Sequence, residues 1–250
     1  MKDRIVSKQA QNNTNKRNVS LLFDIIPDSA VCTTTYNCGQ YIEKFIESFR
    51  KAGVKKFVVC DNFSDDNTGD IHFPLDIAYF KMRTSIGEGR NQAILRNKEK
   101  WTIVADPDNE YDLSHILNFP IDPRFIYIFQ DPVQRSVWIA IGKTSLFLKH
   151  KFINKSVLED VVFFANAPVR YRYIHIGKDL KRGDLIWESK GREQLVDLIT
   201  GGIARSARCL KLGAKFSGLL KLAMRKGPKS FVDIPLVVCG FFAQIMGIIN

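Results

Sequence analysis

Residues 101–109 read Trp-Thr-Ile-Val-Ala-Asp-Pro-Asp-Asn, a short apolar run followed at once by two carboxylates. A nearly continuous apolar run of this length is typical of a strand buried on both faces of a parallel sheet. Asp106 and Asp108 would then emerge where the strand ends. Open α/β sheets bind ligands beyond the carboxyl ends of their strands, so this stretch predicts both the fold class and the place of the site.

The same pattern recurs upstream of this stretch, where β-rich runs alternate with helical patterns. This alternation indicates βαβ units around a mostly parallel sheet. The expected strands are residues 30–35, 56–60, 76–80 and 101–105, and the expected helices are residues 40–52 and 88–98. Further strands are expected at 125–129 and 137–141, a helix at 155–165, and helical apolar spacing at 192–226.

Polar clusters follow three of the expected strands, at residues 35–37, 61–68 and 106–110. Because the carboxyl ends of parallel strands meet at one edge of a sheet, we expect these clusters to converge. Asp61 could accept hydrogen bonds from a ribose hydroxyl or a base N–H. Alternatively, the 61–68 loop is an Asx turn that caps the next helix.

Asp106 and Asp108 are hard oxygen ligands of the kind that Mg²⁺ and Mn²⁺ prefer, which favours a divalent-cation site completed by substrate phosphates. Acidic pairs after strands are also common turn or cap residues. Gly87-Glu88-Gly89-Arg90-Asn91 opens a helix, where Arg90 could meet a phosphate. This stretch is neither a dinucleotide fingerprint nor a P-loop.

Glu159-Asp160 lies on the helix expected at 155–165. A carboxylate there could take the proton of an acceptor hydroxyl as a general base, if it comes within hydrogen-bond reach. A solvated helix face is the alternative.

Taken together and in order, these clusters resemble family 2 of the inverting glycosyltransferases, which have the GT-A fold. The matching elements are Thr33-Thr34-Thr35-Tyr36-Asn37, Asp61-Asn62-x-Ser64-x-Asp66-x-Thr68, Gly87-x-Gly89-Arg90-Asn91-x-Ala93, Val104-Ala105-Asp106-Pro107-Asp108 and Glu159-Asp160. The resemblance covers roughly residues 30–165. It implies single-step transfer from a nucleotide-diphosphate sugar with inversion, without a covalent glycosyl-enzyme.

The resemblance also implies roles for individual residues. The donor-binding residues would be Thr35, Asn37, Asp61, Arg90, Asn91 and Asp106, with Thr35 and Asp61 at the nucleoside and Arg90 near the donor phosphates. Asp108, helped by Asp106, would hold Mg²⁺ or Mn²⁺. Asp160 would be the catalytic base, with Glu159 in the same motif.

The sequence departs from the commonest family pattern in three ways. Gly89 replaces the usual Ala, the first strand ends in a run of Thr, and no Gln-x-x-Arg-Trp follows Asp160. The last absence argues against a processive polysaccharide synthase, so we expect transfer of a single sugar.

The chain's length and composition fit one catalytic domain with an appendage. With 250 residues and 45% hydrophobic composition it can bury one sizeable core. We expect a polar, basic N-terminal extension at 1–28, a GT-A catalytic domain at 29–190 and a helical, basic then apolar segment at 191–250. Residues 19–26 are too short an apolar run for a secretory signal. The five cysteines show no metal or disulfide spacing, which favours a reducing, cytoplasmic setting.

Nearly the whole net charge of +11 lies in residues 168–230. This excess suggests an anionic partner, either nucleic acid or a lipid surface, although a solvated basic face is the plain alternative. Aliphatic residues rather than aromatics interleave the basic ones, which points to lipid and away from nucleic acid. Residues 231–249 are mostly apolar and could lie at the membrane interface, span the membrane or pack in the core.

We therefore expect a peripheral protein on the cytoplasmic face of a membrane, with a polyprenyl phosphate or a glycolipid as acceptor. Two other functions stay open: a nucleotidyltransferase of similar fold, and a basic nucleic-acid-binding or membrane-binding protein without catalysis.

Overall fold

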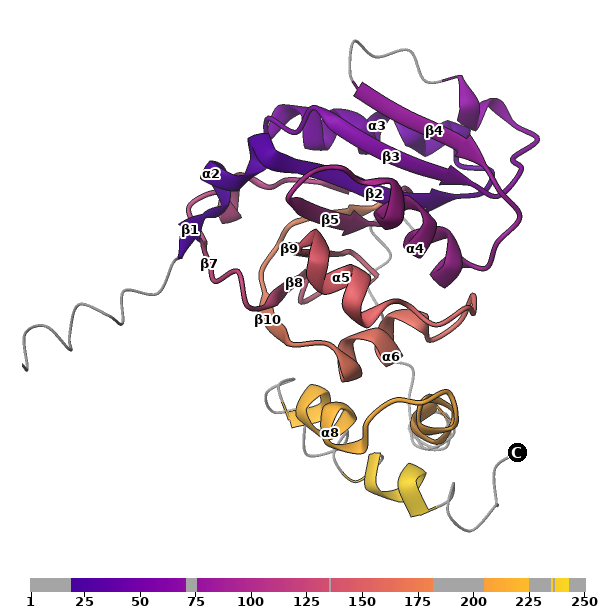
Figure 1. The fold of residues 1–250 in the computed structure, drawn as a ribbon, viewed down its shortest axis with the longest axis vertical. Helices are drawn as coiled ribbons and strands as arrows, with labels where there is room; N and C mark the ends of the chain where they lie inside the picture. The colour runs from indigo at the N-terminus through magenta and orange to yellow at the C-terminus, as the bar shows by residue number, and fades with distance from the viewer. Residues whose placement is uncertain are drawn as a thin grey trace, which may run out of the picture.

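A seven-stranded sheet forms the centre of the computed structural model, which describes residues 19–70, 76–134, 136–181, 205–224, 235 and 237–242 (Figure 1). The strand order is β10-β8-β9-β5-β2-β3-β4. Every neighbouring pair is parallel except the two that β9 forms with β5 and β8. The strands are β2 (Ser29–Thr35), β3 (Lys56–Asp61), β4 (Asp76–Lys81), β5 (Trp101–Ala105), β8 (Ile126–Gln130), β9 (Trp138–Lys143) and β10 (Val169–Tyr173). The expected mostly parallel α/β sheet is confirmed.

Helices cover both faces of this sheet (Figure 1). On one face lies α3 (Gly39–Lys51), whose apolar residues Ile42, Phe45, Ile46 and Phe49 recur at helical spacing and are all buried. On the other lie α4 (Ile86–Arg96), α5 (Thr144–His150) and α6 (Glu159–Asn166). Successive residues of β2 alternate between the two cores, because side chains of a strand point to opposite faces.

The register of the sheet brings the strand ends together. Thr35 at the end of β2 pairs with Asp61 at the end of β3, and Cys32 pairs with Val104 of β5. The polar clusters that follow these three strands therefore share one edge of the sheet. The strands β8 and β10 run in the same direction and end at that edge too.

Most expected elements match the observed ones to within one or two residues, and α6 is the exception. It begins at Glu159 and not at Lys155, because backbone and side-chain groups of α4 hold residues 152–156 in a non-helical path. Leu158 then turns the chain with a φ of 66° before the helix starts. No expected element corresponds to α5, to β10 or to the paired strands β6 (Asn109–Tyr111) and β11 (Gly177–Asp179).

Residues 20–26 pack on the domain, although they were expected to form part of a polar extension. Strand β1 (Ser20–Leu21) pairs with β7 (Pro120–Ile121), and Leu22 is fully buried. The domain therefore begins earlier than residue 29. The remaining short elements are α2 (Leu22–Ile25), η1 (Ile26–Asp28), η2 (Asn67–Gly69) and η3 (Ser114–Ile116).

The described C-terminal residues form a helical layer against α6 (Figure 1). Residues 205–211 are helical, and α8 spans Phe216–Met224. Asn166 at the end of α6 holds this layer in place, because its side chain forms hydrogen bonds with the backbone of Gly213 and Lys215. In the part of the chain that the structure covers, no helix is long and apolar enough to cross a membrane. The helical pattern predicted for residues 192–204 lies outside the described residues.

Candidate functional site

Asp61 is fully buried at the carboxyl edge and is engaged by protein partners. Its carboxylate accepts hydrogen bonds from the backbone and hydroxyl of Ser64 and, at 2.5 Å, from the hydroxyl of Tyr79. Lys81 Nζ lies 3.8 Å away. Asp61 therefore shapes the 61–68 loop, as the turn interpretation predicted, and a direct contact with a nucleoside would require one of these bonds to open.

Thr35 and Asn37 lie on the neighbouring strand end. The Thr35 hydroxyl is buried, and apart from the nearby Cys38 thiol it has no hydrogen-bond partner among the described residues, which makes it a candidate ligand contact. The side-chain oxygen of Asn37 accepts a hydrogen bond from the backbone amide of Asp65. The backbone amide of Asn37 donates a hydrogen bond to Ser64 Oγ. Asn37 thus ties the two loops that follow β2 and β3 to each other.

Two exposed aromatic residues at this edge were not among the predicted site residues. Tyr36 is 59% exposed and Phe63 is 49% exposed. Phe63 has a φ of 58°, a strained backbone conformation for a bulky side chain, and the Arg83 guanidinium lies 5.4 Å from its ring centroid. An aromatic residue directly after a strand's polar end is the sequence signal that could have identified both.

The first turn of α4 contacts the segment that leads into α6. Ser85 caps the helix by accepting a hydrogen bond from the Glu88 amide, and its hydroxyl also reaches Asn154. Asn91, expected to bind the donor, exchanges two hydrogen bonds with the backbone of Phe152, at 2.8 and 2.9 Å. In this structure Asn91 therefore holds the 152–156 segment in place.

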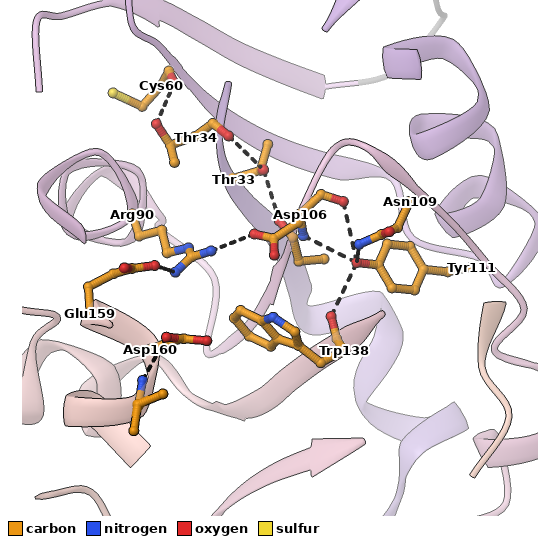
Figure 2. Close-up of polar contacts among 12 residues, drawn as sticks. Thr33, Thr34, Cys60, Arg90, Asp106, Asn109, Tyr111, Trp138, Glu159 and Asp160 are labelled. Carbon is orange, nitrogen blue, oxygen red and sulfur yellow. Dashed lines mark hydrogen bonds and ion pairs between the residues drawn. The ribbon is translucent and has the colours of Figure 1, made fainter. Parts of the chain in front are cut away.

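Arg90, expected near the donor phosphates, is buried and faces carboxylates (Figure 2). Its Nη2 lies 2.5 Å from Asp106 Oδ1, and its Nη1 lies 2.5 Å from Glu159 Oε1. The rings of Trp138 and Phe152 lie 5.1 and 5.4 Å from the guanidinium carbon. Arg90 thus brings two of the predicted motifs, Asp106-x-Asp108 and Glu159-Asp160, to one place.

Asp160 lies in the first turn of α6, beside Glu159 (Figure 2). Its Oδ1 accepts a hydrogen bond from the Val161 amide at 2.7 Å. Burial raises the pKa of Asp160, and Arg90 opposes that rise. The pKa of Glu159 is raised by burial too, again against the influence of Arg90. A carboxyl group with a raised pKa is suited to accept a proton near neutral pH.

Asp106 and Asp108 form the acidic end of the site. Burial raises the pKa of Asp108, and the carboxylates of Asp106 and Asp179 raise it further. Half-buried carboxylates that repel one another are stabilised by a bound cation, so this pair fits Mg²⁺ or Mn²⁺. Among the described residues no three His, Cys, Asp or Glu side chains are placed to enclose a metal ion. The remaining ligands would be water and substrate phosphates, as is usual for Mg²⁺.

The hydroxyl groups of Tyr111 and Thr33 bond to the backbone around Asp106 (Figure 2). Tyr111 Oη accepts a hydrogen bond from the Asp106 amide at 3.2 Å and lies 3.1 Å from the carbonyl oxygen of Trp138. Thr33 Oγ1 donates to the carbonyl oxygen of Ala105 at 2.9 Å. These bonds fix the backbone from which Asp106 projects.

Comparison with known proteins agrees with this geometry. Residues 30–119 match the family model of glycosyl transferase family 2. No curated protein sequence matches the chain.

Solved structures show the same fold at low sequence identity. A mannosyltransferase from Pyrobaculum calidifontis, in complex with GDP-Man and Mn²⁺, is 14% identical over 98% of this chain and 82% of that one, with a TM-score of 0.52. Glucosyl-3-phosphoglycerate synthase from Mycobacterium tuberculosis, in complex with Mg²⁺ and UDP, is 11% identical over 76% and 83%, with a TM-score of 0.50. These similarities confirm the expected GT-A type of fold.

Proposed function

We propose that this protein, whose residues 30–119 match the family model of glycosyl transferase family 2, moves a single sugar from a nucleotide-diphosphate sugar to an acceptor, with inversion and with the help of a divalent cation. One observation carries the proposal: Asp106 at the end of β5 and Glu159 at the start of α6 meet through Arg90. Asp108 and Asp160, the proposed cation ligand and the proposed base, are the neighbours of these two residues.

The residues of the site divide between donor and acceptor. Thr35 and the exposed Tyr36, which follow each other at the end of β2, would contact the nucleoside. Asp106 and Asp108 would hold Mg²⁺ or Mn²⁺, which when bound neutralises charge on the donor's diphosphate. Where the acceptor group is a hydroxyl, Asp160 would accept its proton as that oxygen attacks the anomeric carbon; an ionised lipid phosphate would attack without a base.

The C-terminal layer supports the proposal that the acceptor is a lipid, such as a polyprenyl phosphate or a glycolipid. Lys211, Lys215 and Lys221 are exposed on it, and Met224 and Phe242 are exposed apolar side chains. Basic and apolar groups together favour contact with anionic lipid headgroups. We propose a peripheral position on the cytoplasmic face of a membrane and no nucleic-acid partner.

A donor screen tests the reaction directly. Incubation with labelled UDP-sugars and GDP-sugars, Mn²⁺ and a membrane extract should release a nucleoside diphosphate and label a lipid. Release of pyrophosphate would instead indicate a nucleotidyltransferase, and retention of configuration at the anomeric carbon would contradict the inverting mechanism.

A further inference from the structure

The Arg90 side chain has no open face for a substrate. It is 4% exposed, both of its terminal nitrogens bond to carboxylates at 2.5 Å, and two aromatic rings flank the guanidinium. A guanidinium that binds phosphate presents its donor fork toward the ligand site. Arg90 uses that fork to join Asp106 and Glu159, which come from different layers of the fold (Figure 2).

The rest of the Gly87–Asn91 turn holds the partner of Arg90 in place. The amide of Gly87 donates to Lys155 O at 2.9 Å, and the amide of Ile86 donates to Ser156 Oγ at 3.2 Å. The close approach needs a glycine, since a Cβ at position 87 would lie 1.9 Å from Ile153 O. Helix α6 starts immediately after this segment. The position of Glu159 relative to Arg90 is therefore fixed by the backbone as well as by the ion pair.

We propose that Arg90 is a positioning residue that couples the cation-binding end of the site to the catalytic helix α6, with Glu159 as its counter-charge. The proposal rests on the proposed function, because it assigns Asp106 and Asp108 to a cation. Arg90 occupies Oδ1 of Asp106, while no hydrogen bond among the described residues uses Oδ2. One carboxylate can thus serve Arg90 and the cation at once.

The charge of Glu159 should affect cation binding at Asp106 and Asp108, because Glu159 partly neutralises Arg90. Arg90 carries one positive charge and contacts two carboxylates. If Glu159 lost its charge, Asp106 and Asp160 alone would balance the charge of the buried guanidinium, and the cation site would become more positive. Cation binding would weaken, although Glu159 is not one of the proposed cation ligands.

The decisive variant is Glu159→Gln, studied by calorimetry with UDP and GDP, with and without Mn²⁺. We expect Mn²⁺-dependent nucleotide affinity to fall about tenfold, a common size for coupling between sites, while metal-free affinity is not weakened. Glu47→Gln is the matched control, because Glu47 pairs with Arg50 at 2.5 Å on the surface. Glu159→Gln with wild-type Mn²⁺ dependence would overturn the proposal.

A second measurement needs neither nucleotide nor metal. Asp106→Asn, Glu159→Gln and the double variant are unfolded thermally without ligand. Because both carboxylates hold the same guanidinium, the double variant should lose more stability than the sum of the two single losses. Additive losses would contradict the proposal. If the wild type binds no nucleotide with Mn²⁺, the proposed function fails, yet this cycle still decides whether Arg90 couples the two carboxylates.

Arg90→Lys distinguishes positioning from simple structural support. Lysine keeps the charge and loses the two-pronged geometry. We expect kcat to fall about tenfold or more while KM for the donor stays within about twofold, since Asp106 and α6 would no longer be held together. A lower Tm with unchanged kcat would show that Arg90 only stabilises the fold.

Discussion

The Nη1 atom of Arg90 lies 2.5 Å from the Oε1 atom of Glu159, although 69 residues separate the two in the chain. The contact joins the N-terminal half of α4 to the first turn of α6. It brings the proposed base, Asp160, close enough to Arg90 and Asp106 for their charges to act on it (Figure 2). The proposed catalytic arrangement depends on this one relationship.

Asp160→Asn should abolish most turnover. The substitution keeps the shape of the side chain and removes its basicity, so kcat should fall by about 10² to 10⁴, the usual range for general-base catalysis. Donor affinity should hardly change, in contrast to the loss expected for Glu159→Gln. Steady-state rates at saturating donor check the prediction, and near-wild-type turnover in Asp160→Asn would remove this residue from the mechanism.

The pH dependence of kcat should reflect the protonation of Asp160. Burial, with a smaller contribution from Asp106, raises its pKa, and Arg90 opposes this rise. A base works only when deprotonated, so activity is lost as the pH falls through this raised pKa, at a higher pH than an ordinary aspartate would give. A pH–rate profile checks this. An acid limb at or below the ordinary aspartate pKa would contradict it.

Asp108→Asn should weaken cation binding and stabilise the ligand-free fold. Burial and two neighbouring carboxylates raise the pKa of Asp108, so the stability linked to this group is present at low pH and is lost as the pH rises through its folded pKa. At neutral pH the neutral amide avoids that loss, and the metal-free Tm should rise. Affinity for nucleoside diphosphate with Mn²⁺ should fall at least about tenfold.

Asp112→Asn is the control for that measurement. The pKa of Asp112 is lowered, first by hydrogen bonds from Ser114, so its charge stabilises the fold at neutral pH. The same change from Asp to Asn should therefore not raise the Tm at this position. An equal rise in both variants would show that the effect has no connection with the proposed cation site.

Gly87→Ala should disturb the start of α6 from a distance. The added methyl group would meet the carbonyl oxygen of Ile153, and such overpacking costs about 1 to 3 kcal/mol. Glu88→Ala in the same helical turn is the control, because it removes only a side-chain contact with Gln92 and should stay within about 0.5 kcal/mol. Denaturant unfolding measures both. A Gly87→Ala variant as stable as the wild type would refute the close packing.

Removal of residues 231–250 should move the protein from membrane to soluble fractions while donor binding survives, because the donor residues lie in the sheet domain. The structure adds a stability effect. Val237 is buried against the C-terminal cluster, and the Phe241 ring lies 4.5 Å from that of Phe216. The truncation should therefore also lower the Tm by exposing α8. Persistent membrane association would locate the anchor before residue 231.

The sequence by itself determined the sheet and the place of the site. Strands such as Trp101–Ala105 are continuous apolar runs, and the polar residues after them mark the strand ends. The local sequence pattern was therefore sufficient to predict these strands. The parallel connection then required these ends to share an edge. The order of the motifs also predicted the resemblance to glycosyl transferase family 2 that residues 30–119 show.

Only the tertiary structure decided what several of these residues contact. Arg90 is a strong anion ligand by type, yet it meets Asp106 and Glu159 because the sheet brings together segments that are far apart in the chain. Asp61 likewise directs its carboxylate to Tyr79, a residue of the adjacent strand. The sequence gives the chemical type of each side chain. Its partner is decided by long-range packing, which buries charged groups only where opposite charges or hydrogen bonds compensate them.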